Sequence, residues 1–436
     1  MKKIVQGIGL WVGWSQFAIS ASLAPCSTLL DKSLCAEIGQ MVIVGFGGLN
    51  QDETGKILWQ DSTNTHFTAN SIIAHHIVEQ HIGGVILFSQ SYRNTKTGEF
   101  IRDRNVQNPE QVAELNNALQ QFNTTVRQEQ HLLPLPLFIG IDQEGGHADR
   151  LPATQGFPLR TLIPQAFGAE EKIAGDEPAL KQTALKKTYE YAHQLALELK
   201  NAHFNLNFAP VMDVNVNPLN PIIGGLGRSF SSDPAIVVDQ AQQFIRAFQE
   251  ENIIPVLKHF PGHGSSQADT HLNLVDVTKT YQKDQELYPY ATLFAAHYSG
   301  MVMTTHVING QIDQHACKKG LKEDPATWCP GTLSYATLTE LLRHQLKFEG
   351  VIVSDDMTMG AITLEYPLIS AIEKSVNAGV DLFIMANNDH DYTDDFIDTL
   401  AYLVKVGKIK PERIHEAYRR IVQLKHHALN NEFTRR

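Results

Sequence analysis

Short runs of apolar residues recur along the chain, and each is followed by polar residues and then by a helix-like stretch. Each run is too short for a buried helix and is rich in branched residues, which is typical of a buried parallel strand. There are eight such runs, and they span residues 41–48, 83–88, 135–142, 205–214, 253–260, 301–306, 350–356 and 380–387. The pattern therefore predicts eight parallel strands separated by helices.

The segments between the runs carry apolar residues at helical spacing. One predicted helix face consists of Leu185, Tyr189, Ala192, Ala196 and Leu199, and another of Val237, Ala241, Phe244 and Phe248. Helix starts are marked by Asp233-Pro234 and by Asn108-Pro109, where Gln111 completes a box-like cap. Eight strand–helix alternations over roughly 400 residues favour a closed (β/α)₈ TIM-type barrel, a single α/β domain. A doubly wound open sheet is the structural alternative.

Two polar insertions, residues 50–70 and 89–108, follow predicted strands and should decorate the loop face of the barrel. Overall composition agrees with a globular fold, since 43% of the residues are hydrophobic and 19% are charged. The formal net charge of −11 argues against nucleic acid or an anionic membrane as a partner. The sequence does not specify an oligomeric state.

The N-terminus has the pattern of an export signal. Lys2 and Lys3 precede an uncharged stretch from Ile4 to Ala24, and small residues lie near the end of that stretch. We therefore expect a signal peptide over about residues 1–24, a periplasmic or secreted mature protein and no stable membrane insertion after processing. An uncleaved membrane anchor is the alternative, and the cleavage site stays open.

The four cysteines fall into two sequence-local pairs. An even number suits an oxidising compartment. Pairing Cys26 with Cys35 and Cys317 with Cys329 is one of three possible connectivities, and it needs the least rearrangement of the chain.

Polar residues gather directly after the predicted strands. They include Asp142 to Gly146, Asp213 and Asn215, Lys258 to Gly264, Thr305-His306, Ser354 to Asp356, and Asn387-Asn388. In a (β/α)₈ barrel the carboxyl ends of the strands share one rim, and that rim carries the chemistry. We therefore expect these side chains to converge on one site.

Two groups at this rim suit the cleavage of a glycosidic bond. A retaining glycosidase needs a carboxylate nucleophile and a second group that first donates and then accepts a proton. Asp355, at the end of a buried strand, suits the first role, while Asp356 should point the other way and act as a structural acceptor. In Asp269-Thr270-His271 the carboxylate can orient the imidazole and favour its charged form, so that His271 can exchange a proton near neutral pH.

The longer motifs in this region resemble those of β-N-acetylglucosaminidases of glycoside hydrolase family 3. The matching segments, in the same order as in the family, are Ile141–Gly146 (IDQEGG), Gly227–Phe230 (GRSF), Lys258–Gly264 (KHFPGHG), Asp269–His271 (DTH) and Ser354–Met357 (SDDM). The resemblance covers about residues 36–425, which is nearly the whole of the expected mature chain.

The resemblance implies a (β/α)₈ barrel and roles for individual residues. Asp355 would be the nucleophile, His271 the acid/base and Asp269 its orienting partner. Asp142, Arg228, Lys258 and His259 would bind the ring hydroxyls and the acetamido group of the sugar. No metal and no organic cofactor is implied, and the partner is a carbohydrate substrate derived from peptidoglycan or chitin.

The acid/base also bears on domain organisation. Relatives of the β-glucosidase type take a glutamate acid/base from a second domain, whereas only helical sequence follows the eighth strand here. We therefore expect residues 25–436 to form one catalytic domain and the loop over residues 260–275 to move.

Three features depart from the family pattern. His147 stands where an arginine usually follows the two glycines, although Arg150 is present nearby, so the leaving-group preference becomes uncertain. The segment between Cys317 and Cys329 resembles an insertion that rebuilds one wall of the cleft. Related bacterial enzymes often act in the cytoplasm, whereas this chain carries an export pattern, which leaves the natural substrate open.

Several other functions fit parts of the sequence. A metal-dependent hydrolase could use His259, His263, Asp269 and His271, but Phe260-Pro261-Gly262 breaks the helix that an H-x₃-H pair needs. A non-catalytic sugar-binding protein would require the loss of a key group, and all are present. A phosphorylase, another family 3 glycosidase, and substrate-assisted catalysis by the acetamido oxygen stay open.

Overall fold

The computed structural model describes residues 23–46, 67, 71–93, 100–102, 105–318, 324–388 and 390–433. The expected export signal therefore lies outside the described residues, apart from Leu23 and Ala24. Within the described ranges, no helix is long and apolar enough to cross a membrane.

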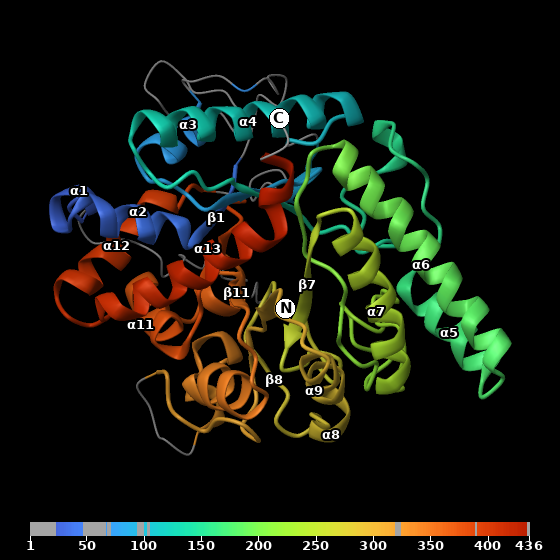
Figure 1. Ribbon diagram of the computed structural model, residues 1–436. Coiled ribbons are helices and arrows are strands. Elements are labelled where there is room, and N and C mark those ends of the chain that lie inside the picture. Colours follow the sequence, from blue (N-terminus) through green and yellow to red (C-terminus); the bar gives the residue numbers. More distant parts are fainter. Residues whose placement is uncertain are drawn as a thin grey trace, which may run out of the picture.

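Eight parallel strands close into a barrel, as the apolar runs predict (Figure 1). Every run supplies one strand: β1 (Val42–Gly45), β2 (Gly84–Ile86), β5 (Phe138–Ile141), β6 (Leu206–Asn207), β7 (Ile254–Phe260), β9 (Met301–Thr304), β11 (Val351–Asp356) and β12 (Leu382–Met385). The first strand pairs with the last, since Val42 lies opposite Phe383 and Ile43 opposite Ile384. This closure excludes the doubly wound open sheet.

Helices follow the strands around the outside of the barrel. They are α3 (Ile72–Val78), α4 (Pro109–Glu129), α5 (Pro164–Ala174), α6 (Pro178–Asn201), α7 (Pro234–Glu250), α8 (Lys283–Glu286), α9 (Tyr288–Ala295), a π-helix over Ala336–Gln345, α10 (Gly360–Thr363), α11 (Leu368–Ala378), α12 (Thr393–Lys405) and α13 (Pro411–Phe433). Two helices precede the first strand, α1 (Cys26–Leu29) and α2 (Lys32–Gln40), and they pack against α12 and α13. The two ends of the described chain thus meet beside the strand pair that closes the barrel.

Short elements in the loops complete the fold. The hairpin of β3 (Gln90–Arg93) and β4 (Phe100–Arg102) lies in the predicted insertion 89–108, and β8 (Val275–Asp276) pairs with β10 (Val307–Ile308). Three 3₁₀ turns cover Ala153–Gln155, Pro325–Thr327 and Gly331–Leu333. The loop face therefore carries the expected decoration in the described part of the insertion 89–108, whereas the predicted insertion 50–70 lies outside the described residues apart from Phe67.

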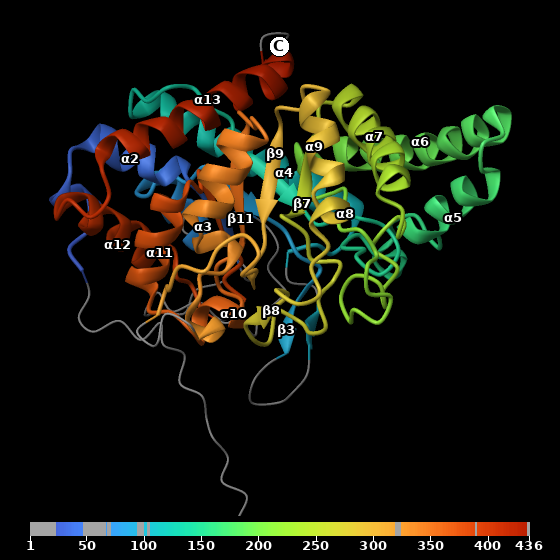
Figure 2. The same cartoon turned by 90° about the horizontal axis from the view of Figure 1, so that it is seen from below.

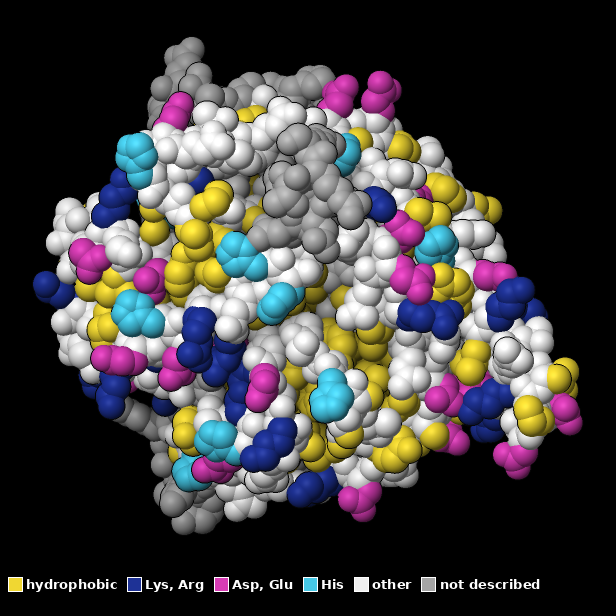
Figure 3. Space-filling model, in the orientation of Figure 1, with side chains coloured by type: hydrophobic (Ala, Val, Ile, Leu, Met, Phe, Trp, Pro, Cys, Tyr) yellow, Lys and Arg dark blue, Asp and Glu magenta, His cyan; other side chains and the backbone are white. Residues whose placement is uncertain are grey.

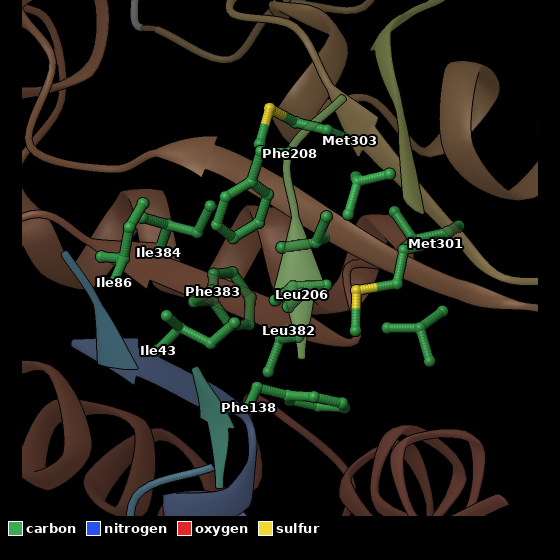
Figure 4. Packing of buried hydrophobic residues seen from close by; sticks show 14 of the residues in the cluster. Ile43, Ile86, Phe138, Leu206, Phe208, Met301, Met303, Leu382, Phe383 and Ile384 are labelled. Carbon is green, nitrogen blue, oxygen red and sulfur yellow. The ribbon is translucent and has the colours of Figure 1, made fainter. Parts of the chain in front are cut away.

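The barrel interior is filled with apolar side chains. Figure 4 shows side chains from several strands packing together, among them Ile43, Phe138, Leu206 and Met301. Gly140 on β5 makes room for a large neighbour, because a Cβ atom at this position would lie 2.9 Å from the ring of Phe208. Close packing of this kind fixes the strand ends, and with them the site, rigidly.

The predicted buried face is correct for helix α7, whereas on helix α6 the buried face is shifted by one residue in its first half. All four predicted residues on the inner face of α7 are buried. On α6, Leu185 and Tyr189 are only half-buried, and the buried stripe instead runs through Ala184 and Thr188 to Leu199. Figures 1 and 2 show that α5 and α6 project away from the barrel, and there α6 packs against α5 and α7 rather than against the strands.

The predicted caps are present. The Asp233 side chain accepts a hydrogen bond from Ala235 N, and the Asn108 side chain accepts one from Gln111 N. The Gln111 side chain accepts from Gln107 N, one residue before the position that a standard capping box uses.

Both predicted disulfides are formed. Cys26 bonds to Cys35 and Cys317 to Cys329, which selects one of the three connectivities.

Charges on the surface are mixed, and on the face shown in Figure 3 acidic and basic side chains are interspersed.

Candidate active site

One cleft at the carboxyl ends of the strands contains all seven residues that the sequence singled out. Its volume is about 360 Å³, within the range of small-molecule sites. The lining includes Asp142, Arg228, Lys258, His259, Asp269, His271 and Asp355. These seven side chains, which come from different strand ends and loops, therefore converge on one cleft, as the sequence predicts.

Asp355 lies at the end of β11 and is held by its neighbours. Its Oδ1 accepts a hydrogen bond from Asp356 N at 2.8 Å, and its own amide donates to Thr304 Oγ1 at 3.4 Å. Burial alone would raise the pKa of Asp355, but the nearby imidazoles of His306, His259 and His271 outweigh it and lower that pKa. The side chain is thus kept as a carboxylate.

Asp356 takes the structural role predicted for it. Its carboxylate accepts hydrogen bonds from Thr358 N, Thr358 Oγ1 and Ala386 N, which ties the end of β11 to the chain after β12. Its side chain nevertheless also lines the cleft. The simple alternation of strand side chains does not hold at this point because the pairing of β11 with β12 shifts register between Val353 and Asp356.

Asp269 and His271 form the expected pair. Asp269 Oδ1 accepts hydrogen bonds from both His271 N, at 2.8 Å, and His271 Nδ1, at 2.7 Å. Burial lowers the pKa of His271, but the hydrogen bond to Asp269 and the charges of Asp355 and Asp269 outweigh it and raise that pKa. Because Nδ1 donates to Asp269, Nε2 is the ring atom suited to proton exchange.

The loop that carries this pair is docked on α10. Gly360 N donates to His271 O at 3.1 Å, and Ala361 N donates to Thr270 O at 3.2 Å. Gly360 has to be glycine for this contact, because a Cβ atom there would lie 2.8 Å from the backbone oxygens of both His271 and Leu272. The docked loop brings His271 into the same cleft as Asp355; its expected movement stays a prediction.

Arg228 and Lys258 belong to a buried ion-pair network. Glu144 accepts two hydrogen bonds from Arg228, both at 2.7 Å, and pairs with Lys258 Nζ at 2.6 Å. Lys258 Nζ also donates to Asp142 Oδ1 at 2.8 Å. Burial would raise the pKa of Glu144, but Arg228 and Lys258 outweigh it and hold that pKa well below its ordinary range. The network fixes two cations beside the cleft.

His259 is oriented by a second buried carboxylate. Its Nδ1 lies 2.6 Å from Asp213 Oδ2, while Asp213 Oδ1 accepts from His263 N at 2.8 Å. Burial would raise the pKa of Asp213, but His259 and His263 outweigh it and lower that pKa. His263 is buried, which lowers its pKa to about 4, so it is neutral at pH 7.

Three residues of this arrangement were expected at the rim, but the sequence assigned them no role in the site. They are Glu144, Asp213 and His306, and each follows or lies at a strand end. His306 is buried, with Nδ1 at 2.8 Å from Thr332 Oγ1 and Nε2 at 3.0 Å from Asp356 O. Their position at the rim was the available signal, but their partners are far away in sequence.

Two of the three departures from the family pattern can be located in the structure, and they occupy different places. His147 is exposed and lines the cleft together with Arg150. Cys317 and Cys329 line a separate cavity with Asp313 and His315, and none of the described residues between the two cysteines lines the cleft of Asp355. For the described part of that segment, the expectation that it rebuilds a wall of this cleft is not met.

Comparison with known proteins relates the chain to sugar-cleaving enzymes. The profile of the glycosyl hydrolase family 3 N terminal domain matches residues 33–424. "Beta-hexosaminidase A" of Pseudoalteromonas piscicida is 33% identical over 351 residues, which are 79% of this chain and 53% of that protein. The chain thus spans about half the length of that relative. A "Beta-hexosaminidase" of Shewanella frigidimarina is 32% identical over 70% of this chain and 75% of its own length.

Solved structures show the same fold. A β-N-acetylglucosaminidase of glycoside hydrolase family 3 from a Paenibacillus species matches with a TM-score of 0.69 at 31% identity, over 90% of this chain and 62% of that one. A β-N-acetylhexosaminidase from Beutenbergia cavernae matches with a TM-score of 0.68 over 91% of this chain and 99% of that one. Its sequence identity is 23%, so this match is evidence for the fold only.

Proposed function

The chain belongs to glycosyl hydrolase family 3, and from that premise we propose that it is a retaining, exo-acting β-N-acetylhexosaminidase. The proposed reaction removes terminal, non-reducing β-linked N-acetylglucosamine from saccharides derived from peptidoglycan or chitin. One observation carries the proposal: a half-buried carboxylate, Asp355, and an imidazole oriented by a carboxylate, His271, line one cleft together with two cations held by Glu144. No metal or organic cofactor takes part in this reaction.

The first step transfers the sugar to the protein. His271, protonated, gives its Nε2 proton to the glycosidic oxygen while an oxygen of Asp355 attacks the anomeric carbon. The bond to the leaving group breaks, the leaving group departs as an alcohol, and a glycosyl ester of Asp355 forms. The raised pKa of His271 and the lowered pKa of Asp355 support these two protonation states at neutral pH.

The second step releases the sugar. His271, now neutral, takes a proton from a water molecule, whose oxygen attacks the anomeric carbon and displaces Asp355. Two displacements at the same carbon retain its configuration. Asp269 keeps the ring in one orientation through both steps and stabilises its positive charge.

The remaining cleft residues would bind the sugar. Asp142 and His259 offer an acceptor and a ring nitrogen, and Arg228 and Lys258 offer N–H donors that suit hydroxyl and acetamido oxygens. The cations are held in place by Glu144, and His259 by Asp213, so these groups are positioned before substrate arrives.

We also propose that residues 25–436 form one catalytic domain that works in the periplasm or outside the cell, after removal of a signal peptide. Two disulfides support this location, because such bonds persist in oxidising compartments. A saccharide released from the cell wall or from chitin is available there.

The test is hydrolysis of a chromogenic aryl β-N-acetylglucosaminide beside the matching β-glucoside, with and without phosphate. We expect a strong preference for the acetamido sugar without any need for phosphate, near-total loss in Asp355→Ala, and a loss in His271→Ala that grows with the pKa of the leaving group. His315→Ala is the matched control, since His315 also pairs with an aspartate two residues earlier but lies outside the cleft. Unchanged activity in Asp355→Ala would overturn the mechanism, and turnover only with phosphate would indicate a phosphorylase.

A further inference from the structure

A cluster of histidine and aspartate side chains lies between α3 and α12, and the proposed reaction does not use it. Its members are His75 and His76 on α3 and Asp394 in the first turn of α12. One nitrogen or oxygen atom from each of these three side chains lies within 4.8 Å of the others, close enough for the three to hold one ion. Among the described residues, this is the group of histidine, cysteine and acidic side chains with that property.

The hydrogen bonds of His76 leave one ring nitrogen facing a carboxylate. His76 Nε2 lies 2.7 Å from Asp391 Oδ2, so this nitrogen carries a proton and donates it. His76 Nδ1 has no hydrogen-bond partner among the described residues, although the side chain is only 1% exposed. The nearest charged atom to it is Asp394 Oδ1, at 3.5 Å. Either a proton on Nδ1 or a cation bound between Nδ1 and the Asp394 carboxylate satisfies both groups.

Two nitrogen–oxygen spacings in the cluster match those between ligand atoms of one metal ion, each nitrogen facing a different oxygen of Asp394. His76 Nδ1 lies 3.5 Å from Asp394 Oδ1, and His75 Nε2 lies 3.6 Å from Asp394 Oδ2. Both distances exceed the usual N–H···O range of about 2.7–3.2 Å. A tetrahedral zinc ion with bonds of about 2.0–2.2 Å separates its ligand atoms by about 3.3–3.6 Å.

Asp391 supplies the support that metal-binding histidines need. A histidine ligand usually donates its other ring N–H to a carboxylate, which fixes the tautomer and the direction of the ring. Asp391 does this for His76, and it is itself held by Asn387 Nδ2 and by Thr393 N, each at 3.0 Å from Asp391 Oδ1. Gln80 Nε2 similarly donates to Asp394 Oδ1 at 2.8 Å.

From this geometry we infer that His75, His76 and Asp394 form a binding site for a divalent transition metal ion of the zinc class. Two imidazole nitrogens and a carboxylate favour zinc over calcium or magnesium, which prefer oxygen ligands. His75 and Asp394 are 45% and 47% exposed, so the ion can enter from solvent and water can complete its coordination.

The position of the site suggests a structural role. Helix α3 follows β1, and α12 follows β12, the two strands whose pairing closes the barrel. An ion held by both helices therefore links the first and last strand–helix units. It also fixes the segment after β12, whose Asn388 lines the active-site cleft. Because the ion binds the folded chain, it stabilises that state by an amount that rises with the logarithm of the free ion concentration once this exceeds the dissociation constant.

The test uses untagged full-length protein, stripped of metal with a chelator and titrated with Zn²⁺ in a calorimeter. We expect one zinc ion per chain, a rise in the thermal unfolding midpoint with zinc, and no comparable effect of Mg²⁺ or Ca²⁺. His75→Ala and Asp394→Asn should each weaken zinc binding at least tenfold. His344→Ala is the matched control, since His344 is also exposed and lies outside the cluster, and it should bind zinc like the wild type.

Two further measurements make the outcome decisive. Thermal unfolding without metal shows whether each variant is folded, so that lost binding is separated from lost structure. Asp391→Asn keeps the size of the side chain and should weaken zinc binding about 10–100-fold, as expected for a partner that orients a ligand. Absence of zinc binding by the wild type, or equal binding by wild type, His75→Ala and Asp394→Asn, would overturn the proposal and leave His76 as a protonated ion-pair partner.

Discussion

The sharpest test of the proposed acid/base is the removal of one charge next to it. In Asp269→Asn the side chain keeps its size, and its amide oxygen can still accept the hydrogen bond from His271 Nδ1, which spans 2.7 Å in the wild type. What is lost is the negative charge that helps to raise the pKa of His271. The variant therefore separates the electrostatic contribution of Asp269 from its contribution to orientation.

The size of the effect follows from the difference between two kinds of hydrogen bond. A bond between charged groups contributes about 1.5–3 kcal/mol and a neutral one about 0.5–1.5 kcal/mol, a difference of about 1–1.5 kcal/mol. The side chains of His271 and Asp269 are 37% and 28% exposed, so solvent screening favours the lower end. A difference of about 1 kcal/mol lowers kcat/KM about fivefold. Removal of the imidazole in His271→Ala should cost more, about 10²–10⁴-fold.

The assay is kcat/KM as a function of pH for aryl β-N-acetylglucosaminides with leaving groups of different pKa. The free protein needs a protonated His271, so the alkaline limb of the profile follows the pKa of this residue. In Asp269→Asn this pKa falls, and the limb should move to lower pH, with the greatest loss for the poorest leaving groups. An alkaline limb at the wild-type position, or an equal loss for good and poor leaving groups, would refute the role of Asp269 and His271 in proton transfer.

Three other predictions concern the nucleophile, the buried ion pairs and the second disulfide. A fluorinated substrate analogue should leave one sugar on the peptide that contains Asp355, detected by mass spectrometry, whereas turnover without any labelled peptide would favour catalysis by the acetamido oxygen. Glu144→Gln should lower the free energy of unfolding by about 3–5 kcal/mol in urea, because two buried cations lose their shared partner. Since the pKa of Glu144 lies below its unfolded value of 4.5, its stabilisation is present above pH 4.5 and is lost as the pH falls further, so the wild type should lose more stability in acid than the variant. Replacing Cys317 and Cys329 together by serine opens a loop with a sequence separation of 12 and should lower the free energy of unfolding by about 3 kcal/mol in the same assay, whereas an unchanged urea midpoint would contradict this.

The barrel could be predicted because its signal is local. Each strand is a short apolar run whose two faces are both buried, so the eight runs stand out against the amphipathic helices between them. The details that escaped prediction depend on neighbours that the sequence does not reveal. Whether Leu185 or Ala184 lies inward on α6 depends on how far that helix projects past the barrel, and the register shift at Asp356 depends on its pairing with β12.

The site was predicted in part for the same reason. Residues that match a motif, such as Asp355 and His259, could be named one by one, but the groups that hold them could not. Glu144 and Arg228 are separated by 84 residues, and Asp213 and His259 by 46. Such pairs form only because the barrel brings the ends of different strands together, and no spacing along the chain indicates which carboxylate will meet which cation.

The value of position over pattern is clearest in the two Asp-x-His pairs of this chain. Asp313 Oδ1 accepts hydrogen bonds from His315 N at 2.8 Å and from His315 Nδ1 at 2.7 Å, which are the same distances as between Asp269 and His271. Local geometry therefore does not distinguish the two pairs. Their surroundings do: the His315 side chain is 81% exposed, whereas His271 lines the cleft of Asp355, whose charge helps to raise its pKa. In the proposed mechanism an imidazole acts on a glycosidic bond only where a second carboxylate faces the same cleft, and of these two pairs only Asp269–His271 shares a cleft with such a carboxylate, Asp355.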